Sequence, residues 1–229
     1  MTTINTIIEK VFNEIWQLTI ADLHITYNHT GKMHGMISIS TSALVNDGCM
    51  RRHQIEGSIC SKCYACKQLK RYKAQDLALI RNAYILTSKV YDVSEMPFLN
   101  AAFVRFEAFG DLINETQFMN YINIAKKNPH CTFAIWTKAP YIMTNVFKSG
   151  IEKPSNMIII YSSIMVNDSV FTFEELKEKM PFIDKMFTVY DKKTIKEKNI
   201  DINCGARSCV GCMRCYTHNT ENVINEMLK

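Results

Sequence analysis

Cysteine is the residue type with the clearest chemical pattern in this chain. Nine cysteines occur in 229 residues, and eight of them fall in two dense sets: Cys49, Cys60, Cys63 and Cys66, then Cys204, Cys209, Cys212 and Cys215. Disulfide frameworks are typical of much shorter secreted chains, whereas clustered thiols in cytosolic proteins are typical of metal or redox centres. We therefore interpret 49–66 and 204–215 as two metal-binding loops.

The spacing within each set favours an iron–sulfur cluster. Each set contains a Cys-x2-Cys-x2-Cys triple, over 60–66 and 209–215, and one further cysteine upstream. In bacterial ferredoxins such a triple supplies three ligands of a cubane cluster and the fourth comes from elsewhere. Structural zinc sites use separated Cys-x2-Cys pairs, so zinc is the alternative metal, with Cys49 or Cys204 completing a tetrahedron. We expect one or two [4Fe-4S] clusters.

Basic residues gather beside these thiols. The formal net charge is +5, and Glu56 is the single acid between Arg51 and Lys73, a segment with seven lysines and arginines. A centre with four thiolates and a 2+ core adds about −2, so two centres would bring the chain to about +1. We interpret the basic excess mainly as compensation for the metal sites. The alternative is contact with nucleic acid through the basic segment 51–73.

The elements that must position these loops form a repeating strand–helix pattern. Apolar strands are predicted over 36–40, 102–107, 132–136, 157–161, 186–190 and 200–203, and amphipathic helices over 5–21, 64–90, 115–127, 141–148 and 173–180. Steps of about 25 to 29 residues between strands are typical of the βα units of parallel sheets and barrels. We expect an α/β fold, a parallel (βα) partial barrel of five or six strands, as a single domain over 1–229 with a helical lead-in over 1–30.

Polar side chains follow the predicted strands at the point where each strand ends. Glu107 and Asp111 follow 102–107, and Thr137 and Lys138 follow 132–136. Functional groups of parallel α/β folds gather at the carboxyl ends of the strands, so we expect these residues and both cysteine sets at one edge. Any one of these residues alone could instead cap a helix or be solvated.

Several segments resemble a phage-encoded family of the gene product 88 type. They are Gly48-Cys49, the run from Cys60 to Ala65, Gly110-Asp111-Leu112, and Thr137-Lys138-Ala139-Pro140. This family and its three-cysteine-motif phage relatives are similar in turn to radical S-adenosylmethionine (SAM) enzymes. That resemblance implies a six-stranded partial barrel, a [4Fe-4S] loop after the first strand, and an acidic turn after the second that holds the amino group of SAM. Glu107 and Asp111 are the residues that correspond to this turn.

The cysteine loop departs from the usual radical SAM pattern. That pattern is Cys-x3-Cys-x2-Cys and leaves one iron open to SAM, whereas this chain has Cys-x10-Cys-x2-Cys-x2-Cys. A fourth thiol could close the open iron. If Cys49, Cys60 and Cys63 are the ligands, as in the three-cysteine relatives, Cys66 lies one helical turn beyond them.

Three function classes remain open. The first is a radical SAM-type enzyme that acts on an unknown substrate, a nucleotide, nucleic acid or peptide. The second is a redox or structural protein with two fully ligated clusters and a partner that donates electrons. The third is a zinc-dependent module that binds nucleic acid. We favour an iron–sulfur protein, rank the enzyme first, and assign no catalytic residue.

Composition indicates the solubility and the cellular location of the protein. Apolar residues make up 47% of the chain and charged residues 21%, which is typical of a soluble globular protein. The longest apolar stretch, 157–166, contains two serines and is far shorter than the roughly 20 residues that cross a bilayer. No signal peptide is evident, so we expect no membrane contact and a cytoplasmic location, in the host cytoplasm if the chain is phage-encoded.

Overall fold

In the computed structural model of the chain, residues 17–168 and 171–228 are described, and their strands form one seven-stranded sheet in which neighbours follow chain order. The first strand is antiparallel to the second, and all others are parallel. The strands are β1 (Thr26–Tyr27), β2 (Ile37–Ile39), β3 (Phe103–Phe106), β4 (Thr132–Thr137), β5 (Met157–Ser162), β6 (Lys185–Tyr190) and β7 (Val223–Met227). The predicted α/β class and parallel strands are confirmed.

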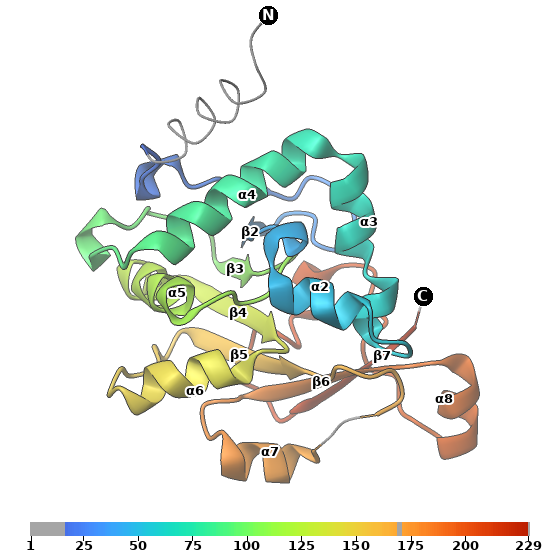
Figure 1. The fold of residues 1–229 in the computed structure, drawn as a ribbon. Coiled ribbons are helices and arrows are strands. Elements are labelled where there is room, and N and C mark those ends of the chain that lie inside the picture. The colour runs from blue at the N-terminus through green and yellow to red at the C-terminus, as the bar shows by residue number, and fades with distance from the viewer. Residues whose placement is uncertain (1–16, 169–170, 229) are drawn as a thin grey trace, which may run out of the picture.

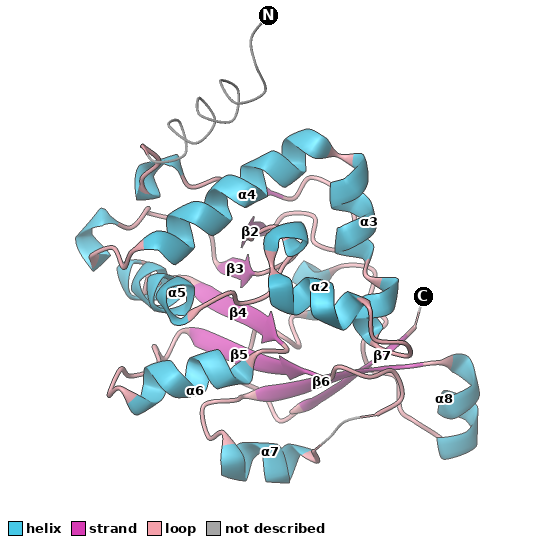
Figure 2. Ribbon diagram, viewed as in Figure 1, coloured by secondary structure: helices cyan, strands magenta, loops and turns pink. Residues whose placement is uncertain are grey.

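Helices cover one face of this sheet, as Figures 1 and 2 show. When parallel strands lie in chain order and every crossover has the same hand, the connecting helices all pack on one side. The α-helices are α2 (Asp47–His53), α3 (Tyr64–Arg71), α4 (Lys73–Ser88), α5 (Glu115–Lys127), α6 (Pro140–Lys148), α7 (Phe173–Lys179), α8 (Lys192–Lys198) and α9 (Cys209–Cys212). Four short 3-10 helices are η1 (Ile20–Asp22), η2 (Ala43–Val45), η3 (Ile59–Lys62) and η4 (Val93–Glu95).

The two faces of the sheet have separate cores. Under the helices lies a large apolar cluster that includes Phe106, Phe118 and Phe133, all with no exposed surface. The other face, which we call the open face, carries a smaller cluster in which the C-terminal segment packs its Tyr216 against Ile158 and neighbouring side chains. The strands are therefore buried on both sides, which explains their continuous apolar runs.

Two predicted elements were wrong in their extent. The helix expected over 64–90 is interrupted at Tyr72, whose φ of −108° and ψ of 84° are not helical. The break lets α3 bury Leu69 in one apolar cluster while α4 buries Ile85 and Leu86 in another. The helix expected over 5–21 lies mostly outside the described residues, and the described part of the 1–30 lead-in contains η1 and β1 instead of a continuous helix.

The last strand also differs from the prediction. No strand forms over 200–203; the final strand is β7, which follows the second cysteine set in the chain. Asn203 and Cys204 do lie beside β7, because the Asn203 side chain donates to the carbonyl of Val223 and the Cys204 N–H donates to that of Asn225. The apolar pattern over 200–203 therefore belongs to a segment that lies beside β7 but forms no strand of the sheet. Among the described residues, no helix is both long and apolar enough to span a membrane.

Candidate metal centres

The first cysteine set lies at the carboxyl edge of the sheet, as predicted. Asn46 caps α2 by accepting a 3.0 Å hydrogen bond from the N–H of Cys49. The loop before η3 then pairs with the segment that follows β5, where the N–H of Ile59 donates to the carbonyl of Ile164 and the N–H of Val166 donates to that of Gly57. These bonds fix the loop across the ends of the parallel strands.

The four thiols of this set have unequal surroundings. Cys49, Cys60 and Cys63 are partly exposed, and every cysteine among the described residues is a free thiol. Cys66 is only 2% exposed and packs in an apolar cluster with Ala43, Leu69 and other small or aliphatic side chains. Cys66 is therefore the most buried residue of the set, and Cys49 and Cys63 pack at the edge of the same apolar cluster.

Asp111 connects this loop to the ends of two strands. Its carboxylate accepts a 2.6 Å hydrogen bond from the guanidinium of Arg52, a 2.7 Å bond from the hydroxyl of Thr137 and a 3.1 Å bond from the N–H of Lys138. The side chain of Asn46 donates to the backbone carbonyl of Asp111 at 2.8 Å. The cysteine loop and the turns after β3 and β4 form one network, with Asp111 only 3% exposed.

Glu107 is the second carboxylate of the acidic turn. It is 2% exposed, with a φ of 55° that non-glycine residues rarely adopt. Its carboxylate accepts hydrogen bonds from the Thr41 N–H at 3.1 Å, from the Gln117 side chain at 2.6 Å, and from the Tyr121 hydroxyl. Burial raises the pKa of Glu107 to about 8 even though hydrogen bonds from Tyr121 and Thr41 lower it.

The remaining predicted site residues lie in the same region. Thr137 contacts Asp111, and the ammonium group of Lys138 lies 2.6 Å from the hydroxyl of Ser162 at the end of β5. The structure thus brings Glu107, Asp111, Thr137 and Lys138 to the same edge, and each already has a protein partner. Binding of a cofactor by these four residues stays a prediction.

Burial raises the pKa of two thiols of the first set, those of Cys49 and Cys66. Burial raises the pKa of the Cys49 thiol, the nearby Asp111 raises it further, and Arg52 opposes both. Burial also raises the pKa of Cys66 to about 11, with a further contribution from Cys63. Metal binding at such thiols must release protons, so it depends on pH.

The second cysteine set is not at the carboxyl edge, and the expectation that both sets share that edge was wrong. The Cys209 N–H donates to the carbonyl of Lys32 in the turn before β2, and Cys209 and Cys215 pack with Tyr216 on the open face. The physical reason is the position of β7. Because β7 follows this set, the chain passes along the open face before it joins the sheet edge.

The four thiols of the second set all influence one another. Burial raises the pKa of Cys215 to about 12, and the neighbouring Cys204, Cys209 and Cys212 raise it further. All four are partly exposed. In neither set do the described Cys, His, Asp and Glu side chains converge in groups of three or more as metal ligands. The thiols lie near one another without meeting at a single point.

The cations nearest the second set in space come from distant parts of the chain. Arg214 lies between its cysteines in the chain, but it forms an ion pair with Glu221 at 2.8 Å. The side chains that interact with the thiols are instead Lys32, with its ammonium group 3.3 Å from the sulfur of Cys204, and Arg105 on β3. No local spacing signal could reveal them, because both are distant in sequence.

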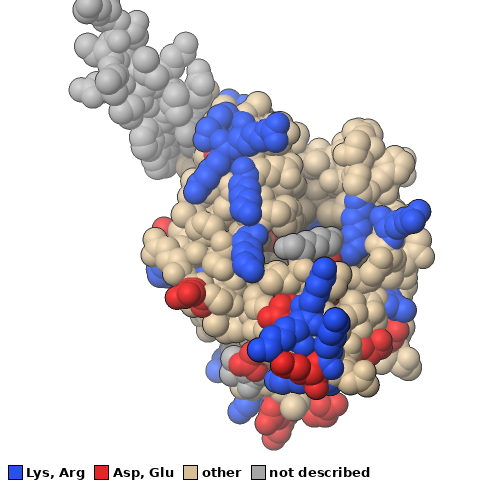
Figure 3. Space-filling view, turned by 90° about the vertical axis from the view of Figure 1, so that its right-hand side faces the viewer, with Lys and Arg blue, Asp and Glu red and all other residues tan. Residues whose placement is uncertain are grey.

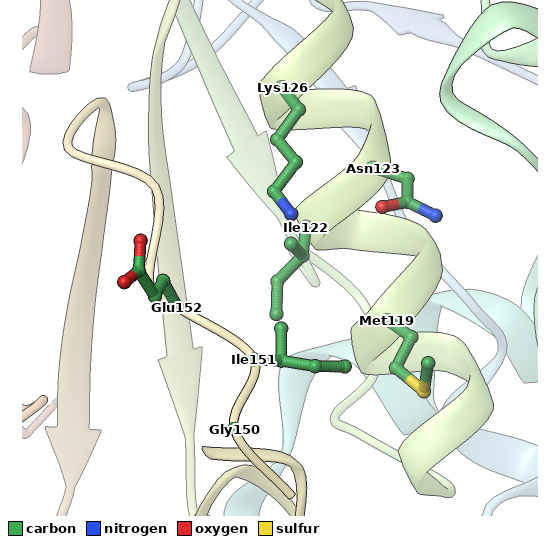
Figure 4. A pocket seen from close by; sticks show the side chains of 7 residues that line it. All are labelled: Met119, Ile122, Asn123, Lys126, Gly150, Ile151 and Glu152. Atoms are coloured by element: carbon green, nitrogen blue, oxygen red, sulfur yellow. The ribbon is translucent and has the colours of Figure 1, made fainter.

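The described part of the surface includes a hollow beside α5 and another beside the second cysteine set. The first, of about 330 Å³, lies between α5 and the loop that precedes β5, and none of its lining residues is a predicted site residue (Figure 4). The second, of about 450 Å³, is beside the second cysteine set. It is lined by Ile202, Asn203, Gly205, Ala206, Gly211, Cys212 and Arg214.

The basic segment 51–73 is largely on the surface. Arg52 is half-buried against Asp111, whereas the other six basic residues are exposed: Arg51, Lys62, Lys67, Lys70, Arg71 and Lys73. Figure 3 faces the side of the molecule that bears α3 and α8 in Figure 1, and Lys and Arg side chains gather there in several groups, with most acidic side chains in the lower half.

A comparison with family models identifies the chain. The model described as gene product 88 matches residues 44–225. The chain belongs to the phage gene product 88 family. The match spans both cysteine sets and the acidic turn of this gene product 88 protein, and it confirms the family resemblance seen in the sequence. No curated protein and no solved structure matches the chain.

Proposed function

We propose that this gene product 88 protein is an iron–sulfur protein of radical SAM type, in which the first cysteine set holds a [4Fe-4S] cluster with one open iron. The observation that carries the proposal is the difference in exposure among the four cysteines of this set. Cys49, Cys60 and Cys63 are partly exposed at the carboxyl edge, while Cys66 is buried among apolar side chains. Three thiolates leave one corner of a cubane cluster without a protein ligand.

The cysteine thiols of the first set are the type of ligand that such a cluster requires. Iron–sulfur clusters are held by thiolates, and all of these thiols are free. A cluster held by Cys49, Cys60 and Cys63 would supply an open iron for SAM and the electron for its reductive cleavage. The chain-order parallel sheet, with α4 to α7 on one face, supports the radical-SAM-like partial barrel as part of the same proposal.

The residues of the acidic turn would position the ligand. Asp111 can accept an ammonium group only by exchanging one of its present partners, and Arg52 is the charged one. The carboxylate of Glu107 is surrounded by donors from Thr41, Gln117 and Tyr121. We assign Asp111 to the ligand and Glu107 to holding the turn, with Lys138 and Thr137 at its side.

A second candidate is a redox or structural protein with two fully ligated clusters. The thiol of Cys66 hydrogen bonds with that of Cys63, so a local shift of α3 could bring it to the cluster as a fourth ligand. The protein would then exchange electrons with a donor protein and would not bind SAM. Zinc in either set is the corresponding alternative metal.

The exposed basic segment indicates nucleic acid as the substrate or partner class. Six exposed cations with one acid favour phosphate contacts, which weaken as salt rises. Binding of a fluorescent single-stranded oligonucleotide should fall at least tenfold when Lys67, Lys70 and Lys73 are replaced by Gln. Equal binding by the variant and the native protein would reject this class.

The test of the main proposal is anaerobic reconstitution followed by analysis of iron, sulfide and zinc and by equilibrium dialysis with SAM. We expect iron and sulfide in equal amounts and SAM bound to the reconstituted protein only. Replacement of Cys63 by Ala should abolish SAM binding, while Cys131→Ala, which removes a thiol outside both sets, should not. Stoichiometric zinc without iron, or no bound SAM, would contradict the proposal.

A further inference from the structure

Cys66 is the cysteine of the first set to which the proposed function assigns no role. It is 2% exposed and lies in the same apolar cluster as Leu69, and Cys63 packs at the edge of that cluster. Both thiols are free. A Cys-x2-Cys pair in the connection between two parallel strands is typical of thiols that exchange with a disulfide, and this pair lies between β2 and β3.

The first turn of α3 holds the two cysteines at a suitable spacing. Cys63 is the N-cap residue of α3, and its carbonyl accepts a 3.4 Å hydrogen bond from the N–H of Lys67. Cys66 is the third residue of the helix. Cα atoms three residues apart in a helical turn are about 5 Å apart, within the roughly 4.4 to 6.8 Å that a disulfide spans. The backbone of this turn therefore already has the spacing that a disulfide needs.

Cys63 is the thiol of the pair that a reagent from solution can reach. It is partly exposed, and among the described residues its side chain makes no hydrogen bond that caps α3. The side chains of Lys62 and Lys67 are exposed on either side of the pair, so a reagent with negative charge is favoured over a neutral one. Cys66 is buried, so an external reagent reaches it only through Cys63.

We propose that Cys63 and Cys66 form a redox-active dithiol, which the anionic glutathione disulfide oxidises in the cluster-free protein. The thiolate of Cys63 attacks one sulfur of the reagent, breaks its S–S bond and releases one glutathione. The sulfur of Cys66 then attacks that of Cys63 and releases the second glutathione. The protein loses two electrons and forms one S–S bond, while the reagent gains two electrons and the two thiol protons.

The disulfide and the proposed cluster exclude each other. Cys63 ligates iron as a thiolate in the proposed function, whereas a sulfur bonded to Cys66 is no longer a thiolate. Oxidation of the pair would therefore block assembly of the first cluster, and reduction would restore it. This consequence rests on the proposed function, but formation of the disulfide does not.

The second set contains a matched pair with the same spacing. Cys209 and Cys212 are free thiols three residues apart in α9. Cys209 packs against the apolar cluster of the open face, whereas Cys212 lines the hollow beside Arg214. These two thiols lie in different surroundings, while Cys63 and Cys66 share one cluster. We therefore expect Cys209 and Cys212 to react as separate thiols.

The test is a redox titration of the cluster-free full chain in mixtures of reduced and oxidised glutathione. Free thiols are then blocked with iodoacetamide in denaturant, and the protein is digested with trypsin without reductant for mass spectrometry. Cleavage after Lys and Arg gives peptide 63–67, which holds Cys63 and Cys66, and peptide 208–214, which holds the control pair. Cys60 falls in another peptide, so a bond between Cys60 and Cys63 would appear as two linked peptides.

We expect peptide 63–67 to appear without alkyl groups and two hydrogens lighter than its dithiol form. Because proximity raises the effective concentration of the second thiol, its oxidised fraction should exceed that of peptide 208–214 by at least about tenfold. Dithiothreitol should reverse the change. In Cys66→Ala the reaction should stop at a mixed disulfide between Cys63 and glutathione, whereas Cys131→Ala should behave like the native protein.

Three results would overturn the inference. The first is a peptide 63–67 that carries two alkyl groups even in excess glutathione disulfide. The second is equal oxidation of peptides 63–67 and 208–214, and the third is a bond from Cys63 to Cys60 in place of Cys66. Reconstituted protein provides a separate comparison, because a cluster on Cys63 should slow the oxidation. Equal oxidation with and without reconstitution would count against Cys63 as a cluster ligand and leave the disulfide standing, so the two failures are distinguishable.

Discussion

Cys66 and Cys215 each end a Cys-x2-Cys-x2-Cys triple, yet their surroundings differ. In the first set α3 continues for two turns from Tyr64, so Cys66 lies on its apolar face and is 2% exposed. In the second set α9 ends at Cys212 and the next residue, Met213, has a φ of 56°, so Cys215 lies outside the helix and stays partly exposed. Identical spacing thus places the last cysteine in an apolar cluster in the first set and leaves it partly exposed in the second.

The charged surroundings differ in the same way. The first set borders two buried carboxylates, Glu107 and Asp111, with Arg52 between loop and turn. The second set borders Lys32 and Arg105. The first set therefore has buried carboxylates beside it, whereas the second set has cations. A carboxylate suits recognition of an ammonium group, so the proposed ligand site concerns the first set alone.

The largest expected effect is a difference in metal content between variants that lack the last cysteine of the first or of the second triple. Cys66→Ala should leave the iron and sulfide content of the reconstituted protein unchanged if, as proposed, Cys49, Cys60 and Cys63 are the ligands. Cys215→Ala should lose the iron of the second centre, about half of the total, because a thiolate ligand is removed. Iron and sulfide analysis after gel filtration checks this. Equal losses in the two variants would show that both triples bind metal in the same way.

The next effect concerns the ion pair that joins the first loop to the acidic turn. Arg52→Gln leaves Asp111 buried without its cation, which should lower the free energy of unfolding by about 3 kcal/mol. Arg214→Gln breaks an ion pair whose side chains are 36% and 40% exposed, and should cost about 0 to 1 kcal/mol. Urea unfolding of the metal-free proteins measures both. Similar losses would mean that the Arg52 pair is not a fixed part of the first site.

A glycine comparison examines how tightly each site is packed. A Cβ at residue 110 would lie 2.5 Å from a carboxylate oxygen of Glu107 and 2.7 Å from the carbonyl of Thr41, whereas one at Gly205 would have no neighbour within 4 Å. Gly110→Ala should therefore destabilise the protein by about 2 kcal/mol, as overpacking typically does. Gly205→Ala should have little effect. Thermal unfolding checks the pair, and a stable Gly110→Ala variant would contradict the tight turn.

The effect that changes gradually with conditions is a pH dependence, of at most about 1.4 kcal/mol per pH unit, that comes from a buried carboxylate of the first site. Burial raises the pKa of Glu107 to about 8, so between about pH 4.5 and 8 the folded state holds a proton that the unfolded state releases. The stabilisation is complete at low pH and is lost as pH rises, by at most about 1.4 kcal/mol per pH unit. Urea unfolding of the metal-free protein from pH 5 to 8 measures it. Glu107→Gln should remove this slope, and an unchanged slope would assign it to other groups.

The sequence allowed the parallel sheet and the location of the acidic turn to be predicted closely. The strand at 157–161 was right because a continuous apolar, β-branched run is typical of a strand buried on both faces, and the helix at 115–127 was right because its apolar positions recur at helical spacing. Glu107 and Asp111 were placed at the carboxyl edge because polar residues directly follow an apolar strand. The helix break at Tyr72 was missed, since helical spacing continues on both sides of it.

The second site was predicted less well for a physical reason. Its location depends on β7, whose five residues follow the cysteines and carry a weak strand pattern that includes Asn225 and Glu226. The cations Lys32 and Arg105 reach it through tertiary contacts that no spacing encodes. Local motifs revealed which residues could bind metal, but the surroundings that distinguish the two centres arise only from the fold.

The most direct test of the account is electron paramagnetic resonance of the reduced, reconstituted protein as SAM is added. The central claim is that the first cluster has an open iron because Cys66 stays in the apolar core. We expect the spectrum of one cluster to change with SAM in the native protein, the same change in Cys66→Ala, and none in Cys63→Ala. A native spectrum unchanged at saturating SAM, together with a response in Cys66→Ala, would show that Cys66 closes the site and would contradict the account.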